Sequence, residues 1–468
     1  MKPFPLLVLT ALLAAPAAAQ TLTLRQAVDT ALADNNELKS ARESVKSSGY
    51  TLRSSYGNFL PHIAAEAAGT RLDSPIELDL NPVRSAIIAA NAATLGAAGG
   101  TPAQSAALAG ALNSALPDFN MQVQKQTYYQ LALTAYQPLY AGGRIRAASK
   151  AKKEALAGAE KNYDALRDKV VAGVITGYFR LLLLDRVTEI RRQTLEGMRE
   201  HDETARKLYE QGMISNVNRL RAGVALAEAD RELKKAARDR ELAAILLSNL
   251  TGADISSATL VTGFIPAEPP SSPDEFTAKA AASNPSLSLL SHSRGQLEAK
   301  YSVAKAGMRP TVTAFGKYEL YKADLTVLDP EWAAGISVKL PLFSGFSDYE
   351  DIRAARADLA AIDQLTANAR KLVRTEVLKD HHDMAAAAEQ YESLDKSLDL
   401  TAENLRLNKL SFAQGVATSL EVVDAQLALD RVKTERYSAL YNYACALTEL
   451  LRACGDELNI LNYPEKAI

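Results

Sequence analysis

The sequence is poor in the residues that usually carry enzyme chemistry or hold a metal. Its 468 residues include only five histidines and two cysteines. No two histidines have the i, i+4 spacing of a helical metal site, and the adjacent His381 and His382 would point about 100° apart on a helix. A Gly-x-Ser-x-Gly elbow is absent, and Gly142-Gly143 lacks the Lys-Ser/Thr pair of a phosphate loop. We therefore expect no enzyme activity, no cofactor and no metal.

An excess of charge of either sign is also absent. The chain has 53 basic and 55 acidic residues, a balance too even to favour a nucleic-acid partner. The two cysteines, Cys445 and Cys454, are nine positions apart in a helical pattern. That spacing places them about 13 Å apart along a helix axis, beyond the reach of a disulfide. We expect both thiols to be free.

Long apolar runs are missing as well. Beyond the N-terminus the longest is Val170–Leu184, which has 15 residues and is interrupted by Arg180, whereas a membrane-spanning helix needs about 20. If this chain crosses a membrane, we expect it to do so with strands. The longer uncharged stretch Ser85–Pro117 is rich in Ala, Ser and Asn and is broken by Gly99-Gly100 and Pro102. We interpret it as a loop with at most a short helix.

The N-terminus has the layout of a cleavable secretory signal. Lys2 precedes an apolar run from Leu6 to Ala15, and Ala17-Ala18-Ala19 follows it. The run is too short to span a bilayer. No cysteine follows the small residues, so we expect no lipid anchor. We predict a signal peptide at 1–19 and an exported chain that begins near Gln20.

The exported chain contains an internal duplication. In the early part of each copy, matching residues are 249 positions apart, as are Asn35 and Asn284. In the later part the offset is 203, as between Gly212 and Gly415. The difference of 46 residues is an insertion, which falls between residues 75 and 120 of the first copy.

This duplication predicts the domain organisation. The first copy covers 20–252, with a long loop at 75–120, a long helix at 144–211 and a returning helix at 216–250. A linker at 253–272 leads to the second copy at 273–455, which has a long helix at 346–414 and a returning helix at 419–453 and is followed by a C-terminal tail at 456–468.

Each copy has two stretches in which apolar and polar residues alternate with the period of a strand. They are Ile63–Ala67 and Tyr129–Ala135 in the first copy, and Val312–Leu320 and Trp332–Leu340 in the second. Strands of about ten residues with aromatic residues near their ends are typical of membrane barrels. The aromatic residues here are Trp332, Tyr318, Tyr321, Tyr128 and Tyr129. The alternative is an ordinary half-buried hairpin on a soluble core.

Four strands cannot close a barrel, because the smallest membrane barrels have about eight. The barrel interpretation therefore requires an oligomer. The periodicity alone leaves two or three chains open.

Helical composition continues without proline through the long-helix segments, each about 100 Å long at 1.5 Å per residue. Apolar positions within them recur at a three-four-three-four spacing, which is the seam of a left-handed coiled coil. These positions are Leu156, Ala159, Tyr163, Leu166 and Val170, and at the 203 offset Leu359, Ile362, Thr366, Ala369 and Val373. Each returning helix is about half as long. Stacked end to end with the helix at 36–57 or 286–308, it nearly matches the long helix.

The whole arrangement resembles the TolC family of outer membrane efflux proteins, and the resemblance covers essentially the entire exported chain. The most specific segments are the turns at 208–215 and 410–418, each with a Gln-Gly pair, and the strand-ending segments at 137–143 and 340–345, each with a Pro-Leu pair. The resemblance implies a mixed α+β fold, mostly α. In it a homotrimer forms one outer-membrane β-barrel, with four strands per chain, and continues as a long periplasmic α-helical coiled-coil barrel.

The resemblance also implies partners and a location. The barrel would be surrounded by lipid in the outer membrane of a Gram-negative bacterium, and the helices would extend into the periplasm. The tips of the helical hairpins would close the entrance and dock a periplasmic adaptor, or membrane fusion protein, attached to an inner-membrane pump. In this sequence the tips are Gln211-Gly212 and Gln414-Gly415. Glycines at these turns are equally expected as ordinary helix C-caps.

Two further implications concern the entrance. The resemblance places an acidic constriction at Glu421 and Asp424, which are three residues apart and share one helix face. Six carboxylates in a trimer would favour cations and raise one another's pKa by repulsion. Without the resemblance, such a pair is ordinarily a solvated surface.

The sequence departs from the family at the latch that closes the entrance. Asn218 and Ala417 stand where an acidic residue and an arginine would pair, and Phe412 replaces the nearby tyrosine. Arg219 and Arg221 are candidate substitutes.

We therefore predict a passive outer-membrane exit channel of a tripartite efflux or type I secretion system. Its cargo, whether drugs, metals or proteins, is left open by the sequence. The alternative function is a secreted periplasmic coiled-coil scaffold or adaptor protein.

Overall fold

The computed structural model describes residues 21–255, 258–326 and 328–464, so the predicted signal peptide lies outside the described residues. The chain divides into two compact units. The first, the helical unit, comprises Met1–Thr51, Lys152–Leu297 and Ala357–Ile468, and the second, the sheet unit, comprises Leu52–Ala151 and Glu298–Arg356.

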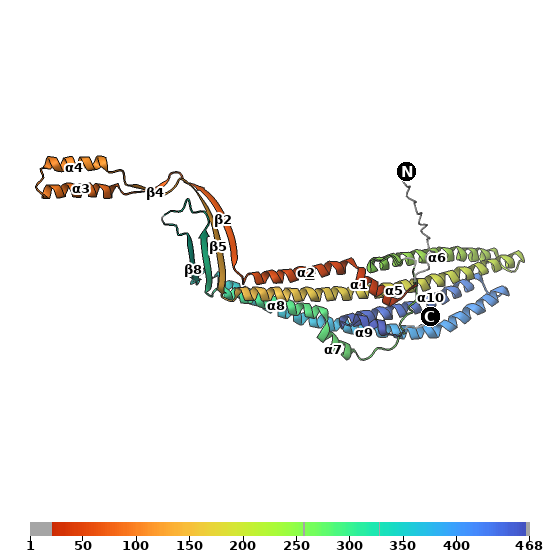
Figure 1. Cartoon of the computed structure of the whole chain (residues 1–468). Coiled ribbons are helices and arrows are strands. Elements are labelled where there is room, and N and C mark those ends of the chain that lie inside the picture. The colour runs from red at the N-terminus through yellow and green to blue at the C-terminus, as the bar shows by residue number, and fades with distance from the viewer. Residues whose placement is uncertain (1–20, 256–257, 327, 465–468) are drawn as a thin grey trace, which may run out of the picture. The chain divides into compact units, whose positions relative to one another are not determined.

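Helices make up most of the chain (Figure 1), and eight α-helices of the described residues lie outside the insertion. They are α1 (Leu24–Asp34), α2 (Asn36–Gly57), α5 (Arg144–Glu210), α6 (Asn216–Thr251), α7 (Pro273–Ser283), α8 (Pro285–Ala306), α9 (Ser347–Ala413) and α10 (Ser419–Ala453), followed by the 3-10 turn η1 (Glu457–Asn462). Helices α5 and α9 have 67 residues each, which corresponds to about 100 Å. The predicted long helices, 144–211 and 346–414, agree with the observed bounds to within one residue at each end.

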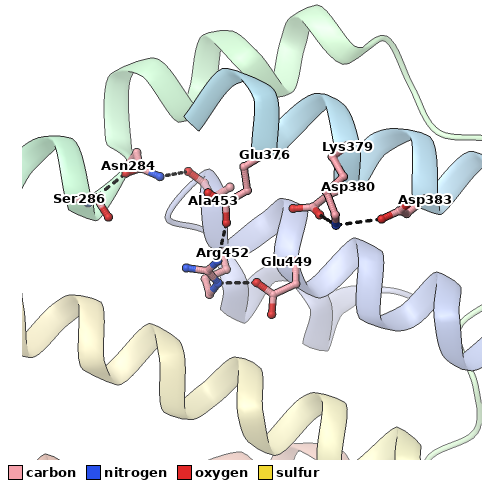
Figure 2. Close-up of polar contacts among 9 residues, drawn as sticks. All are labelled: Asn284, Ser286, Glu376, Lys379, Asp380, Asp383, Glu449, Arg452 and Ala453. Atoms are coloured by element: carbon pink, nitrogen blue, oxygen red, sulfur yellow. Dashed lines mark hydrogen bonds and ion pairs between the residues drawn. The ribbon is translucent and has the colours of Figure 1, made fainter. Parts of the chain in front are cut away.

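One asparagine joins two short helices end to end in each copy. The side-chain oxygen of Asn284 accepts a hydrogen bond from the Ser286 amide at the start of α8 (3.0 Å), and its side-chain nitrogen donates to the Ala453 carbonyl at the end of α10 (2.9 Å) (Figure 2). In the first copy, the side-chain oxygen of Asn35 likewise accepts a hydrogen bond at the start of α2. Its side-chain nitrogen donates to the Leu250 carbonyl near the end of α6 (3.0 Å). Each asparagine thus satisfies backbone groups at two helix ends. The predicted end-to-end stacking of the short helices is confirmed.

Polar contacts between helices give their lateral order in the half of the helical unit nearer the Gln-Gly turns. Helix α6 contacts α5, α5 contacts α10, and α10 contacts α9, through the pairs Arg240–Asp185, Thr194–Asp430 and Arg436–Asp395. Helix α6 also approaches α10 closely. Because these polar contacts join α6 to α5 and α9 to α10, we take α6 and α9 as the two outer helices of the group.

The predicted coiled-coil seam is the covered face of the long helices. On α9, Leu359, Ile362, Thr366 and Ala369 are half-buried and Val373 is buried, while most residues between them are exposed. On α5, Val170 belongs to the main hydrophobic core, and Tyr163 and Leu166 pack against it. The spacing of apolar residues therefore identified the packing face correctly in both copies.

The middle of the helical unit carries the main core. Tyr178 and Phe179 of α5 have 0% exposed surface. The Tyr178 hydroxyl donates to the Leu22 carbonyl and accepts from the Thr262 amide, both at 3.0 Å. These bonds fix the short parallel strands β1 (Thr21–Leu22) and β6 (Thr259–Leu260) against α5. The segment predicted as a linker, 253–272, therefore contributes to the packing around the middle of the long helices.

The sheet unit contains one four-stranded antiparallel sheet. Its strands are β2 (His62–Arg71), β5 (Thr127–Ala141), β7 (Thr311–Glu319) and β8 (Trp332–Lys339), in the order β2-β5-β7-β8. Strands β2 and β8 are the edges, and among the described residues neither pairs with a further strand on its outer side. The register pairs Val312 with Val338 and Tyr318 with Trp332.

One face of this sheet is apolar and uncovered in the single chain. Trp332, Ile336 and Val338 on β8 are 67%, 66% and 66% exposed, and they alternate with Ala333, Gly335 and Ser337 on the other face. A contiguous exposed apolar surface of this kind indicates contact with lipid or with another chain.

The insertion differs from its prediction. Instead of a loop with at most a short helix, the structure has two helices, α3 (Asn81–Ala97) and α4 (Pro102–Ala115), on a ribbon of β3 (Ile76–Asp79) and β4 (Asn120–Gln124). Alanine has the highest helix propensity, and Pro82 and Pro102 stand in the first turns, where a missing N–H costs nothing. The Pro and Gly residues mark the boundaries of two helices rather than breaking one segment into loop.

Among the described helices, none is both long and apolar enough to cross a bilayer. Cys445 and Cys454 are both free.

Candidate entrance site at the helix tips

Each long helix ends in a turn that requires glycine. Gly212 and Gly415 have φ of +72° and +78°, which glycine adopts without strain. After α5, the Met213 amide donates to the Leu208 carbonyl at 2.8 Å, the bond of a Schellman cap, and α9 ends in the same way. A Cβ built at Gly212 would meet no atom within 4 Å. The backbone conformation, and not crowding, selects glycine there.

The two tips are neighbours within one chain. A Cβ built at Gly415 would lie 3.7 Å from Met213 Cε. Gln211 and Gln414, which precede the glycines, are exposed. The four residues predicted for adaptor docking, Gln211, Gly212, Gln414 and Gly415, therefore lie together at one end of the helical unit.

Helix α10 begins with a capping box. The Glu421 carboxylate accepts hydrogen bonds from the Thr418 amide (2.6 Å) and hydroxyl (2.9 Å), and the Glu421 amide donates to the Thr418 hydroxyl (3.4 Å). The bonds to its carboxylate hold the pKa of Glu421 below its usual value. Asp424, one turn further on, is exposed like Glu421. The structure therefore places the two predicted carboxylates side by side at the tip, and it assigns Glu421 a capping role that the sequence analysis missed.

A small apolar cluster packs beneath the tips. Its buried members are Ala205, Leu208, Ala222, Leu405, Phe412, Val422, Ala425 and Leu429. Phe412 is only 1% exposed, and Ala417 packs against the cluster. These two residues, predicted near the gate, therefore hold α5, α6, α9 and α10 together.

A histidine joins the two helical hairpins beside this cluster. His201 of α5 is 5% exposed, its Nε2 lies 2.8 Å from the Ser419 hydroxyl of α10, and its ring centroid lies 4.5 Å from that of Phe412. Burial and the neighbouring Lys409 lower the pKa of His201 to about 4, although Asp202 opposes the shift. The contact between α5 and α10 is therefore made by a neutral imidazole at neutral pH.

Asp430 makes a second polar contact between the same two helices. It is 2% exposed, accepts hydrogen bonds from the Thr194 hydroxyl and from the Gln426 amide (2.8 Å), and lies 3.6 Å from the Arg191 guanidinium. Burial raises the pKa of Asp430, and these hydrogen bonds counteract the shift.

Sequence analysis missed both of these buried residues, although a signal for His201 was present. Met198, His201, Ala205 and Leu208 follow the three-four-three spacing of a seam. A polar residue at a seam position indicates a specific buried contact.

The remaining residues predicted near the latch of the entrance lie at the start of α6. The Asn218 amide donates to the Ser215 hydroxyl (3.4 Å). Arg219 donates to the Asn216 side chain (3.0 Å), and its guanidinium lies 5.5 Å from the Tyr209 ring centroid. Arg221 is exposed. These contacts stay within the α5–α6 hairpin, so the role of Arg219 and Arg221 as a substitute latch stays a prediction.

The aromatic residues predicted for a girdle lie toward one end of the sheet, where β5 and β8 begin and β7 ends. Tyr318 pairs with Trp332 on one side and with Leu133 on the other. Tyr129 is four residues from Leu133 on β5 and lies on the same face, whereas Tyr128 lies on the opposite face. The Tyr321 amide donates to the Leu131 carbonyl (3.2 Å). Trp332, Tyr318 and Tyr129 thus share the apolar face of the sheet.

The sequence matches the model of one protein family, described as outer membrane efflux protein, at residues 27–253 and 277–456. These two segments correspond to the two copies of the duplication. No curated protein matches the sequence.

Several solved structures share the fold. The outer-membrane channel OprN is 17% identical, with a TM-score of 0.73 over 92% of this chain and 90% of that one. The CmeC outer membrane channel of Campylobacter jejuni is 17% identical, with a TM-score of 0.69 over 93% and 86%. The MtrE outer membrane channel of Neisseria gonorrhoeae, in its open state, is 20% identical, with a TM-score of 0.63 over 93% and 89%.

Proposed function

Since the chain belongs to the outer membrane efflux protein family and is an outer-membrane channel with a periplasmic extension, we propose that it is the passive exit duct of a tripartite efflux system. The observation that carries this proposal is the match of the family over both copies. It also excludes the alternative of a periplasmic scaffold or adaptor. The partner pump would supply the energy.

The channel would be a homotrimer, as the resemblance to the TolC family implies. Three chains contribute twelve strands, enough to close a barrel. The uncovered edges β2 and β8 would pair between neighbouring chains. The exposed apolar face with Trp332, Ile336 and Val338 would then contact outer-membrane lipid, with Tyr318, Tyr321, Tyr128 and Tyr129 near one boundary of the membrane.

The helix tips would dock a periplasmic adaptor that is attached to the inner-membrane pump. Three observations support this. The glycine turn at Gly212 leaves open space for a partner backbone, Gln211 and Gln414 are exposed, and apolar side chains at the tips are uncovered. Met213 is 50% and Val416 79% exposed. Exposed apolar side chains at the end of a helical hairpin are suited to a protein partner.

Val416→Glu tests this docking. Unlike Gly415, Val416 does not have a positive φ, so the substitution places a charge on the tip without straining the turn. We expect pump-dependent efflux in the native host, deleted for its own copy, to fall by about tenfold, because a buried unpaired charge at an interface costs at least about 1.4 kcal/mol. The measurement is drug or dye efflux at matched levels of assembled trimer.

Val261→Glu is the matched control, because Val261 is 55% exposed and lies far from the tips in the sequence. It should leave efflux unchanged. Full efflux by an assembled Val416→Glu trimer would contradict docking at the tips.

Glu421 and Asp424 would form the acidic ring of the entrance. Both are exposed and adjacent on the first turns of α10, next to the docking residues. A trimer would bring six carboxylates to a narrow opening and favour cations there.

A further inference from the structure

The helical hairpin of the insertion has an outer surface that is uncharged and rich in alanine, although Ser85, Asn91 and Thr94 of α3 are exposed polar residues. Figure 1 shows α3 and α4 side by side beyond the β3–β4 ribbon. Ile88 is 8% exposed and Leu95 is half-buried, and both face α4. Arg84, the last charged residue before an uncharged stretch that ends at Pro117, donates to the Leu116 carbonyl (2.9 Å). Its charge therefore serves to close the hairpin and does not supply a solvated face.

The face of α3 that points away from α4 has the residue spacing of a coiled-coil seam. Val83, Ala86, Ala90, Ala93 and Ala97 follow a three-four-three-four spacing and are all exposed. On a helical wheel with 100° per residue, this set is centred about 180° from Ile88 and Leu95. Val83 is 52% and the flanking Ile87 42% exposed. A surface helix normally has its polar side opposite its packed face, whereas on α3 that side is formed mainly by alanine and valine.

The ribbon that carries the hairpin continues this apolar surface. Leu78 pairs directly with Met121 across β3 and β4, so these two side chains lie on one face, and Ile76 lies near them at a shift in the strand register. The exposed fractions are 53% for Ile76, 49% for Leu78 and 43% for Met121. In the described part of the chain, neither α3 nor α4 has an extensive contact with any helix or strand other than the other. The insertion thus has an exposed apolar surface that no other described element of its own chain covers.

We propose that the occupant of this surface is the same surface on neighbouring copies of the chain, so that three α3 helices pack along the Val83–Ala97 seam and cap the extracellular mouth. The inference rests on the proposed trimer. Strand β2 leads directly into the insertion and is an edge of the sheet, so each hairpin follows the strand at which two subunits would meet. Three identical surfaces meet without repulsion because residues 85–117 carry no charge. The alanine seam allows close helix approach.

A lipid surface fits the hairpin less well. Helices that lie on a membrane combine basic residues on a polar face with large anchors such as Trp or Phe. Residues 81–115 contain neither Trp nor Phe, and the one basic residue is Arg84, which is committed to the hairpin.

Cysteine cross-linking tests the cap. In a chain with Cys445 and Cys454 replaced by alanine, Ala90→Cys places one thiol per subunit on the seam. Asn91→Cys, the matched control, is exposed and sits on the next residue, about 100° round the helix. On oxidation in intact outer membranes we expect Ala90→Cys to give a covalent dimer containing about two-thirds of the chains, because only two of three thiols around an axis can pair. Asn91→Cys should give at least about tenfold less.

The outcomes separate the two proposals. A trimer in which only Ala90→Cys links supports the cap. A trimer in which neither variant links, or both link equally, overturns the cap and leaves the channel proposal intact. Absence of a trimer in the parent chain, measured by native mass spectrometry, overturns the proposed assembly and the cap with it. As a second readout, Ala90→Glu should raise single-channel conductance if the seam closes the mouth, and unchanged conductance in an assembled trimer would contradict closure.

Discussion

At the scale of single residues, Glu421 shows how one carboxylate can serve the fold and the pore. Its oxygen caps α10 through Thr418, and this hydrogen bonding keeps its pKa low. The sequence analysis anticipated repulsion that raises the pKa within a trimeric ring. The two effects act in opposite directions, so capping would help the ring to stay ionised at a crowded entrance.

Glu421→Gln combined with Asp424→Asn separates these roles. Glutamine still accepts the Thr418 amide in a capping box, so the variant removes charge and keeps the turn. We expect the cation-to-anion permeability ratio in planar bilayers to fall by about twofold or more, because the fixed negative charge at the constriction is lost. Glu435→Gln, further along α10, is the control and should leave the ratio unchanged. Equal ratios for the entrance variant and the parent channel would remove these carboxylates from the entrance.

At the scale of elements, His201 makes the packing between the two helical hairpins depend on pH. Its pKa is about 4 in the folded chain against about 6.5 in an unfolded one. A lowered histidine pKa means that its contribution to packing is fully present above about 6.5 and is lost as the pH falls toward about 4. The loss is on the order of 3 kcal/mol, since each unit is worth about 1.4 kcal/mol.

We therefore expect the start of α10 to loosen on acidification. Hydrogen exchange of residues 419–425, corrected for intrinsic rates, should speed up by up to about tenfold per pH unit between pH 6.5 and 4.5. His201→Asn cannot become charged and should show a flat profile over that range. The same acid response in parent and variant would assign the effect to another group, with Glu421 the next candidate, because its capping bonds hold its pKa low.

The elements also show what the sequence could and could not predict. The bounds of α5 and α9 were predictable because a proline-free seam and a glycine cap are local signals. The Asn284 and Asn35 joints depend on carbonyls more than 160 positions away in the chain, which no local pattern encodes. Helices α3 and α4 were missed because Gly99 and Pro102 were interpreted as interruptions, although alanine content alone favoured helix.

At the scale of the whole molecule, the outer helices α6 and α9 present matching edges. The exposed large aliphatic residues are Leu365, Leu372, Leu400, Leu407 and Leu410 on α9, and Val217, Leu220, Val224, Leu242, Ile245 and Leu246 on α6. Four of those on α9 (365, 372, 400 and 407) and three of those on α6 (217, 224 and 245) are separated by multiples of seven, the period of a coiled coil. Because α9 runs toward the tips and α6 away from them, one chain's α9 would meet the next chain's α6 antiparallel.

Charge on the two edges is complementary between the apolar positions. Lys235 and Arg238 on α6 are 23 and 26 residues from Gly212, and Glu392 and Glu389 on α9 are 23 and 26 residues from Gly415. All four side chains are exposed. Since the two tips lie at the same level, each basic residue would stand opposite an acidic residue of the neighbouring chain.

Reversing the charges on one edge should weaken the trimer, and reversing the charges on both edges should restore it. In Lys235→Glu with Arg238→Glu, like charges face each other in three interfaces, at a cost of up to about 1 kcal/mol per exposed pair. We expect the temperature at which heated samples lose the trimer band to fall by several degrees, and adding Glu389→Lys and Glu392→Lys to recover most of that loss. Arg192→Glu with Arg199→Glu on α5 makes the same charge change away from the edges and should have little effect. Recovery by the second pair is the decisive result, because general destabilisation by the first pair would not be reversed by a further charge reversal on a different helix.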